Sequence, residues 1–333
     1  MKKLVNFISA ILVVIAIVNI MPNPAAESVF EMDIAGATGY GVIDLNIRAA
    51  DSSKSSLVAK ISAGQPFVIL SEGTSYLQVR LSDGRIGYAS KTYTMINLPD
   101  VIPSIIYKNS NSESALYRSS EKALPGVTGQ AMYDAKSWND RLGREEYNMA
   151  CLFDMAKKIA VAQAAALSDG NTLVIYEAYR PYETQVAVKN ALAGMMNDST
   201  VKAGIGTKNS GWGESWFISQ GVSNHQRGGA IDVSLADAET GVEYAMPTQM
   251  HELSKAARTF EKTISSWDKT GWKKLQLSSD FTEGAKLLQG YCTRAGMTPL
   301  ASEWWHFNDI DALLATGKAG AGNFVLSSNV SEI

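Results

Sequence analysis

The chain has 333 residues, of which 46% are hydrophobic and 19% charged, and it contains no low-complexity tract. This composition excludes a disordered, collagen-like or coiled-coil protein, and the length predicts two domains of roughly 100–200 residues each. The formal net charge is −3 and basic residues do not cluster beyond Lys2 and Lys3, so we expect no nucleic-acid partner. Cys151 and Cys292 are too few for a disulfide scaffold, a CxxC redox centre or a cysteine-rich zinc site.

The first 26 residues have the pattern of an export signal. Lys2 and Lys3 precede an apolar run over residues 7–21, and prolines and small residues follow. This pattern is typical of a secretory signal, and the run is shorter than the roughly 20 residues of a membrane-spanning helix. Residues 1–26 are therefore a signal peptide or an uncleaved N-terminal anchor, the latter being the only expected contact with a membrane. We expect an exported protein, in the cell wall or extracellular space or on the outer face of the cytoplasmic membrane.

Residues 38–97 are predicted to form a small all-β barrel. Asp83 and Gly84 predict a two-residue hairpin turn, and four or five strands in so short a segment are typical of a barrel. The stretch L-N-I-R at 45–48 and the later G-Y-A at 87–89 resemble bacterial SH3-like domains of cell-wall enzymes. That resemblance implies a module that binds the cell wall. The strands are expected at residues 42–48, 66–70, 76–81 and 85–88.

Residues 98–136 carry three prolines and a polar Asn-Ser tract, and we interpret them as a linker and lead-in. Residues 137–325 are predicted to form an α+β domain, a small antiparallel sheet with flanking helices. Cys151 and Cys292 would lie on helices as buried thiols, with a bridge between them left open. Helices are expected over residues 145–167 and 181–196, and strands over residues 173–176, 230–235 and 304–307.

The segment S-N-H-Q-R-G-G-A-I-D at residues 223–232 is the first that suggests chemistry. Its two glycines allow a tight turn, which would bring His225 back beside Asp232 on the predicted strand. One imidazole and one carboxylate are ligands suited to zinc. The pair by itself is a weak signal and needs a further ligand.

A second segment, S-E-W-W-H-F at residues 302–307, supplies that ligand in His306 and a carboxylate in Glu303. Three protein ligands leave the fourth zinc position open to water, whose pKa falls to about 7. A carboxylate that is not a ligand can take the proton of that water and deliver it to a leaving amine. On a regular strand Glu303 and His306 would face opposite ways, so we expect a twist, bend or bulge between them.

Together these motifs resemble the zinc D,D-peptidase family, which includes D-alanyl-D-alanine carboxypeptidases and the D-Ala-D-Ala dipeptidases of vancomycin resistance. The family pattern S-x-H-x-x-G-x-A-x-D is met in full at residues 223–232. E-x-x-H is met by Glu303 and His306, and Y-R-P is met at residues 179–181. The three motifs make the resemblance specific, and it covers the chain from about Asp100 to the C-terminus.

The resemblance implies a role for each residue. Glu303 would be the catalytic base. Arg180 would stabilise the oxyanion or orient the substrate, as a fixed cation can, and Ser223 would contact the substrate. The implied ligands of one zinc ion are His225, Asp232 and His306.

The implied reaction is hydrolysis of the terminal D-Ala-D-Ala bond of peptidoglycan stem peptides. A dipeptidase acting on free D-Ala-D-Ala is the first alternative: the double tryptophan and the Y-R-P context favour it, whereas the SH3-like segment and the export signal favour the wall substrate. A non-catalytic cell-wall-binding protein is the second alternative, against which stands the complete set of ligands and base. His251 matches no ligand motif, and we predict that it lies on a helix surface or at a helix start.

Overall fold

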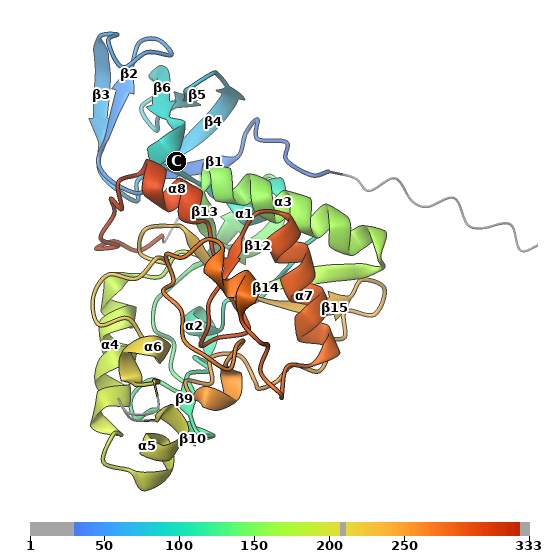
Figure 1. The fold of residues 1–333 in the computed structure, drawn as a ribbon. Coiled ribbons are helices and arrows are strands. Elements are labelled where there is room, and N and C mark those ends of the chain that lie inside the picture. Colours follow the sequence, from blue (N-terminus) through green and yellow to red (C-terminus); the bar gives the residue numbers. More distant parts are fainter. Residues whose placement is uncertain (1–29, 207–210, 327–333) are drawn as a thin grey trace, which may run out of the picture.

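The computed structural model describes residues 30–206 and 211–326 (Figure 1). The predicted export signal lies outside these ranges. Within them, none of the helices combines the length and the hydropathy that crossing a membrane requires.

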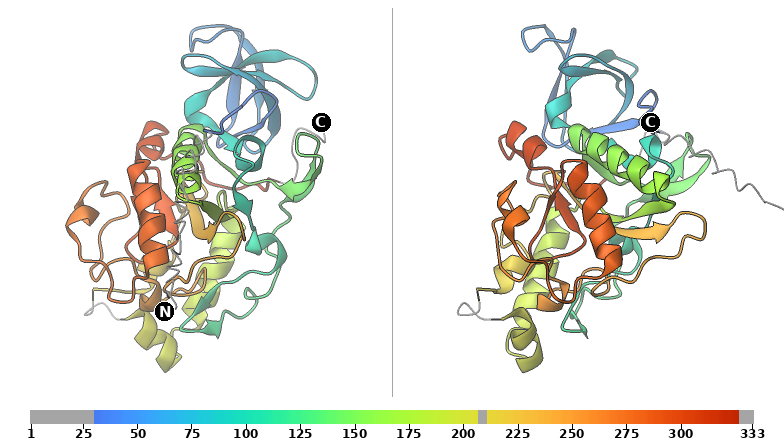
Figure 2. Two further views of the ribbon diagram at one scale, coloured as in Figure 1. Left: turned by 90° about the vertical axis from the view of Figure 1, so that its right-hand side faces the viewer. Right: turned by 45° about the vertical axis from the view of Figure 1, so that its right-hand side comes forward.

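An eight-stranded antiparallel sheet curls through the N-terminal part of the molecule (Figures 1 and 2, blue to cyan, with β13 in green). Its strands are β1 (Thr38–Gly41), β2 (Leu45–Arg48), β3 (Leu57–Ile61), β4 (Pro66–Glu72), β5 (Tyr76–Arg80), β6 (Ile86–Ser90), β7 (Thr94–Asn97) and β13 (Ala150–Leu152). The order across the sheet is β13-β7-β1-β4-β5-β6-β2-β3, and the 3₁₀ turn η1 (Lys91–Tyr93) precedes β7. The β-rich N-terminal region is therefore confirmed, and β13 extends its sheet from a point much later in the chain.

The predicted hairpin turn is confirmed between β5 and β6. Tyr76 pairs with Ser90, and Arg80 pairs with Ile86. Gly84 has a φ of +83°, which suits glycine in a tight turn. Asp83 Oδ1 accepts the backbone N–H of Arg85 at 3.1 Å. The turn thus depends on the local chemistry of two residues.

A five-stranded sheet forms the centre of the second part. Its order is β16 (Thr298–Pro299), β17 (His306–Asn308), β15 (Ala230–Asp237), β14 (Asn171–Glu177) and β8 (Ile106–Tyr107). All pairs are antiparallel except β8 with β14. Helix α3 (Phe153–Ser168) packs on β14, and α7 (Glu283–Arg294) packs on β15 and on α3. The α+β class predicted for this part is confirmed.

Smaller elements surround the sheet. Three helices begin with a side chain that caps the N-terminus. Its oxygen accepts backbone N–H groups of the first turn, as is usual for Asp and Thr at this position. The capping residues are Asp198, Thr282 and Asp309. The remaining helices are α1 (Leu98–Val101), α2 (Ser110–Glu113), α4 (Tyr182–Gly194), α5 (Ser199–Ile205), α6 (Glu214–Phe217), α8 (Ile310–Ala315), η3 (Lys255–Ala257) and η4 (Gly271–Lys274). The remaining strands form the hairpins β9 (Arg118–Ser119) with β10 (Lys122–Ala123), and β11 (Lys136–Asn139) with β12 (Arg144–Tyr147).

The helix expected over residues 145–167 begins only at Phe153, so its first turns were predicted wrongly. The residues before it form β12, which pairs with β11, and β13, which pairs with β7. The spacing of apolar residues within one segment does not show such pairing. Cys151 consequently lies on β13 and not on a helix. Cys151 and Cys292 are both buried free thiols, which answers the question of a bridge.

Segment 98–136 contains short helices and strands up to Ala123. It contains α1, β8, α2 and the β9–β10 hairpin, and β8 pairs in parallel with β14 at Val174 and Ile175. The segment expected as a linker and lead-in therefore contributes an edge strand to the second sheet.

A continuous core joins the two sheets. It includes Phe67 and Ile47 from the first sheet and Ile231 and Trp305 from the second, all nearly fully buried. A separate apolar cluster lies around α4 and α5 and includes Leu192. The central strands β14 and β15 are buried along almost their whole length, which makes them a rigid base for the side chains at their ends.

Candidate metal centre and active-site cleft

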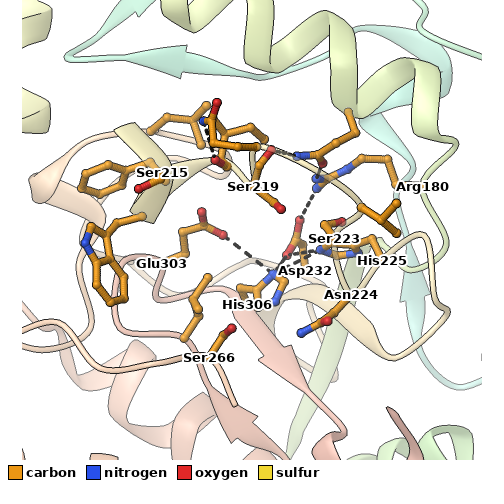
Figure 3. A pocket seen from close by; sticks show the side chains of 18 of the residues that line it. Arg180, Ser215, Ser219, Ser223, Asn224, His225, Asp232, Ser266, Glu303 and His306 are labelled. Carbon is orange, nitrogen blue, oxygen red and sulfur yellow. Dashed lines mark hydrogen bonds and ion pairs between the residues drawn. The ribbon is translucent and has the colours of Figure 1, made fainter. Parts of the chain in front are cut away.

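A cavity of about 560 Å³ opens at the edge of the second sheet, where β14 ends and β15 and β17 begin (Figure 3). The turn that follows β14 and the loop over residues 215–227 form much of its wall. Trp267, Ser265 and Ser266 close another side. The cavity contains every residue that the motifs predicted: Arg180, Ser223, His225, Asp232, Glu303 and His306.

The turn before β15 brings His225 back beside Asp232. The backbone N–H of Gly229 donates to the carbonyl of Asn224 at 2.9 Å, and Gly228 N–H donates to the carbonyl of His225 at 3.0 Å. Gly228 has a φ of +68°, in the region that favours glycine. The register of β15 with β17 then pairs Asp232 with His306.

Three donor atoms form a nearly equilateral triangle in the cleft. His306 Nδ1 lies 3.0 Å from Asp232 Oδ1 and 3.1 Å from His225 Nε2, and His225 Nε2 lies 3.3 Å from Asp232 Oδ1. Atoms bound tetrahedrally to zinc at about 2.0–2.1 Å lie about 3.3 Å from one another. The spacing and the donor types therefore fit zinc, and the cluster is buried.

Hydrogen bonds outside the triangle fix both imidazole rings. His225 Nδ1–H donates to the carbonyl of Ala178 at 2.7 Å, and His306 Nε2–H donates to Asn308 Oδ1 at 3.0 Å. Asn224 donates to the same Asn308 oxygen at 2.8 Å. Because each ring gives its proton to an outer partner, the bare nitrogen faces the triangle, as metal-binding histidines require.

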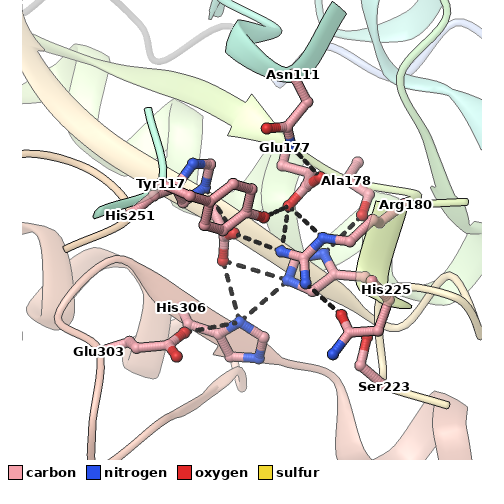
Figure 4. Close-up of polar contacts among 12 residues, drawn as sticks. Asn111, Tyr117, Glu177, Ala178, Arg180, Ser223, His225, His251, Glu303 and His306 are labelled. Carbon is pink, nitrogen blue, oxygen red and sulfur yellow. Dashed lines mark hydrogen bonds and ion pairs between the residues drawn. The ribbon is translucent and has the colours of Figure 1, made fainter. Parts of the chain in front are cut away.

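Arg180 sits between two carboxylates. Its Nε donates to Glu177 Oε2 at 2.8 Å, its Nη2 donates to the same oxygen, and Nη2 lies 3.3 Å from Asp232 Oδ2 (Figure 4). Nη1 donates to Gln185 Oε1 at 2.7 Å. Burial alone would lower the pKa of Arg180, but the neighbouring Glu177 carboxylate holds it well above its usual value. The guanidinium is therefore a fixed positive charge at the wall of the cleft.

Negative charge exceeds positive charge among these buried groups. Two buried carboxylates, those of Glu177 and Asp232, contact the single guanidinium of Arg180. Burial would raise the pKa of Asp232, but the histidines around it lower that pKa well below its usual value. Burial raises the pKa of Glu303 to about 8. A divalent cation at the triangle would balance the excess negative charge, which is a second reason that the residues fit zinc.

Glu303 shares the cleft with His306 because no regular strand joins them. Residues 303–305 form a turn, β17 begins only at His306, and the strand expected over 304–307 was placed too early. His306 N–H donates to the Glu303 carbonyl at 3.3 Å, and Glu303 Oε2 lies 3.7 Å from His306 Nδ1. The expected bend is therefore confirmed, and Glu303 lies beside the ligand triangle without belonging to it.

Ser223 lines the cleft at the mouth of the motif loop. Its backbone N–H donates to Gln226 Oε1 at 2.7 Å. Its hydroxyl has no hydrogen-bond partner among the described residues. The hydroxyl oxygen is buried, so it is a hydrogen-bonding group with unused capacity at the wall of the cleft.

His251 lies in the cleft, so its prediction as a helix-surface or helix-start residue was wrong. It is buried, and its Nε2 lies 3.1 Å from Asp232 Oδ2. Tyr117 was also missed as a member of the site, and it comes from the segment interpreted as a linker. The available signal was the histidine count: the sequence has three histidines, and all three lie in this cleft.

Comparisons with known proteins agree with this site. Residues 117–319 match the peptidase family model described as D-Ala-D-Ala dipeptidase, and residues 43–95 match the model described as bacterial SH3 domain. The chain belongs to the D-Ala-D-Ala dipeptidase family of peptidases and carries a bacterial SH3 segment ahead of the peptidase part.

Individual relatives are distant. The D-alanyl-D-alanine dipeptidase of Escherichia coli (strain K12) is 26% identical over 181 residues, which cover 54% of this chain and 72% of that protein. A mutant of the vancomycin-resistance D,D-pentapeptidase VanY from a VanB-type cassette, in complex with Zn(II), shows 16% identity and a TM-score of 0.29 over 62% of this chain and 92% of its own. VanYB in complex with D-alanine-D-alanine shows 14% identity and a TM-score of 0.29 over 58% and 88%.

Proposed function

We propose that this protein is a zinc-dependent D,D-peptidase that acts as a D-alanyl-D-alanine carboxypeptidase on peptidoglycan stem peptides. The observation that carries the proposal is the ligand triangle with a separate carboxylate and a fixed guanidinium in one cleft. The ligands of the single zinc ion are His225, Asp232 and His306. Zinc bound there would act as a Lewis acid on water and on the scissile carbonyl.

Glu303 is the proposed base. It takes a proton from the water that attacks the carbonyl of the penultimate D-Ala, and it then gives that proton to the amino group of the leaving D-Ala. The C–O bond forms first, which places negative charge on the former carbonyl oxygen; the C–N bond then breaks as the nitrogen is protonated, so one water is consumed and one D-Ala is released. A raised pKa suits a group that must both accept and donate a proton near neutral pH.

Arg180 is the proposed electrostatic partner of the carbonyl oxygen. Glu177 and Gln185 hold its guanidinium in place before substrate arrives. A positive charge that is already oriented stabilises the negative charge that develops on the oxygen without reorganisation. Ser223 is proposed to contact the substrate through its free hydroxyl.

The size of the cleft favours an acylated substrate over the free dipeptide. Its volume of about 560 Å³ lies in the range of drug-sized ligand pockets, roughly 300–1,000 Å³, which is large for two alanines. Trp216 and Trp267 also line the cleft and offer apolar surface to more of a stem peptide. The SH3 segment would hold the enzyme on the cell wall, in keeping with export by residues 1–26.

The test is mass spectrometry of reactions of the purified protein, loaded with zinc or treated with a chelator. Free D-Ala-D-Ala and a muramyl pentapeptide are supplied side by side. Zinc-dependent loss of one alanine from the pentapeptide is expected. Cleavage of the dipeptide alone would instead establish the alternative, a D-Ala-D-Ala dipeptidase.

If zinc binds and neither substrate changes, the D,D-peptidase proposal fails. A sedimentation assay with intact sacculi then tests the non-catalytic alternative. Retention of the protein on sacculi without any cleavage would support a cell-wall-binding protein.

A further inference from the structure

His251 adopts a backbone conformation that few side chains take. Its φ is +62°, in the left-handed region, which only a few per cent of residues other than glycine adopt. Its carbonyl accepts the N–H of Arg118 at 3.1 Å, and the N–H of Leu253 donates to the Arg118 carbonyl at 2.7 Å. Backbone bonds on both sides therefore hold a strained residue in place. Strain of this kind is retained where a side chain must occupy one position.

Aromatic rings fix the His251 side chain. The ring stacks on Tyr117 with centroids 4.3 Å apart and planes 9° apart, and the edge of Trp305 lies across it at 6.0 Å. The Tyr117 hydroxyl in turn donates to Glu177 Oε2 at 3.1 Å (Figure 4). Only 1% of His251 is exposed. The imidazole is thus buried and held by its contacts with two aromatic rings.

The two oxygens of Asp232 have different partners. Oδ1 faces His225 and His306, whereas Oδ2 faces His251 Nε2 at 3.1 Å and Arg180 Nη2 at 3.3 Å. Since a carboxylate accepts, we assign the imidazole proton to Nε2. We infer that His251 is a positioning residue for Asp232: its hydrogen bond to Oδ2 keeps Oδ1 directed at the zinc site. The inference rests on the proposed zinc site.

Arg180 by itself is not sufficient to fix the orientation of the Asp232 carboxylate. Two of its nitrogens donate to Glu177, a third donates to Gln185, and its contact with Asp232 is the longest of the set. Arg180 is also the group proposed to engage the substrate carbonyl. His251, unlike Arg180, is not proposed to contact the substrate. It therefore holds Asp232 in the same orientation before and after substrate binds.

An alternative interpretation is that His251 is a ligand of a second metal ion. Its ring nitrogen, Glu177 and Asp232 do lie within 4.8 Å of one another. However, Glu177 Oε2 already accepts from Arg180 and Tyr117. A cation placed there would lie against the guanidinium, and the repulsion between like charges disfavours it. The hydrogen-bonded role is therefore the better one.

Three substitutions separate these roles. His251→Phe keeps a ring on Tyr117 but removes the N–H donor. His251→Asn tolerates the left-handed backbone, but its amide is too short to reach Asp232. His251→Gln places an amide N–H near the position of Nε2. The readouts are zinc affinity by chelator competition, zinc stoichiometry, the visible spectrum of the Co²⁺ form, and the melting temperature of the metal-free protein.

We expect one zinc per chain in all forms. His251→Phe and His251→Asn should bind zinc about 10–100-fold more weakly, as loss of an outer partner usually causes, and should shift the Co²⁺ bands. His251→Gln should stay within a few-fold of the unaltered protein. Metal-free melting temperatures that match across the set would exclude a general loss of fold.

The outcomes distinguish this inference from the proposed function. If the unaltered protein binds one zinc and releases D-Ala while all three variants match it in affinity and spectrum, only the role of His251 is overturned. Two zinc ions per chain, with one lost in His251→Phe, would make His251 a ligand and would also overturn it. If the unaltered protein binds no zinc, both the proposed function and this inference fail.

Discussion

Glu303 and His306 show how a local turn decides the chemistry of single residues. A strand would direct the two side chains to opposite faces. The turn at residues 303–305 instead brings the Glu303 carboxylate to 3.7 Å from His306 Nδ1, where burial raises the pKa of that carboxylate to about 8. Its position beside the proposed ligands, and not among them, suits it to the proposed role of moving protons.

Glu303→Gln should abolish most of the activity and leave the metal site intact. An amide cannot accept the proton of water, so D-Ala release from the pentapeptide should fall about 10²–10⁴-fold. Mass spectrometry measures the release, and metal analysis should still find one zinc. The matched control is Glu283→Gln on α7, whose side chain is 85% exposed and far from the cleft lining. Loss of zinc from Glu303→Gln would show that Glu303 is a ligand, contrary to the proposal.

At the scale of elements, the turn between residues 224 and 229 joins the ligand site to the first sheet. The Gly228 carbonyl accepts the N–H of Leu152, the last residue of β13, at 2.7 Å. A Cβ at Gly228 would lie 2.7 Å from Met95 Sδ on β7. Neither a side chain nor an ordinary φ is therefore tolerated at this position, three residues after His225.

Gly228→Ala should destabilise the protein and weaken zinc binding together. The left-handed backbone costs about 1–2 kcal/mol for a side chain, and crowding against Met95 adds about 1–3 kcal/mol. Gly84→Ala is the matched control, because its φ of +83° is similar but a Cβ there meets open space. Urea unfolding and chelator competition check both variants. Equal losses of stability in the two, with unchanged zinc affinity, would contradict this account of the turn.

At the scale of the whole molecule, the C-terminal segment 318–326 connects the first sheet to the cleft. The Phe324 ring packs on Gly64, in the turn before β4, and stacks on Tyr179 with centroids 4.7 Å apart. Tyr179 directly precedes Arg180, and its hydroxyl donates to the Phe324 carbonyl at 2.9 Å. One aromatic side chain thus contacts the SH3 segment and the residue next to Arg180 of the cleft.

Phe324→Ala should lower the free energy of unfolding by about 1–3 kcal/mol, because it removes a partly buried ring and an aromatic pair. Val325→Ala is the neighbouring control, since Val325 is 43% exposed. Denaturant unfolding measures both. If Val325→Ala costs as much as Phe324→Ala, the ring stack does not join the two parts.

A second connection depends on charge. Glu72 on β4 lies 2.6 Å from Lys91 of η1 and 2.6 Å from Lys157 on α3. Burial raises the pKa of Glu72, but the two lysines together lower it below its usual value of 4.5. The ion pairs therefore contribute stability above about pH 4.5, and that contribution is lost as the pH falls through the lowered pKa.

Glu72→Gln should reduce stability at pH 7 and lose its effect in acid. The difference in urea midpoint between the variant and the unaltered protein should shrink as the pH is lowered from 5 towards 3, since protonated Glu72 no longer attracts the lysines. Lys157→Gln should show the same trend. A difference that stays constant over this range would contradict the ionic origin of the connection.

The order of motifs and the local turns could be predicted from residues alone. Asp83 and Gly84 specify a hairpin turn through their own backbone preferences, and the segment 223–232 specifies its tight turn through two glycines. The residues of the ligand triangle were predicted from their motifs and from the resemblance of those motifs to a zinc D,D-peptidase family. Those features depend on near neighbours in the chain, or on a metal whose demands are known.

Features made by distant contacts could not be predicted in this way. β13 is a strand because it pairs with β7, which is distant in the sequence. The local pattern of apolar residues therefore predicted a helix there. His251 carries no motif: its place follows from a backbone bound to Arg118 and a ring stacked on Tyr117. The sequence by itself thus determined which residues could bind zinc and move protons. The tertiary structure alone decided which other side chains orient them. Hydrogen bonds and ring contacts between residues far apart in the chain produce no regular spacing in the sequence, so no motif predicts them.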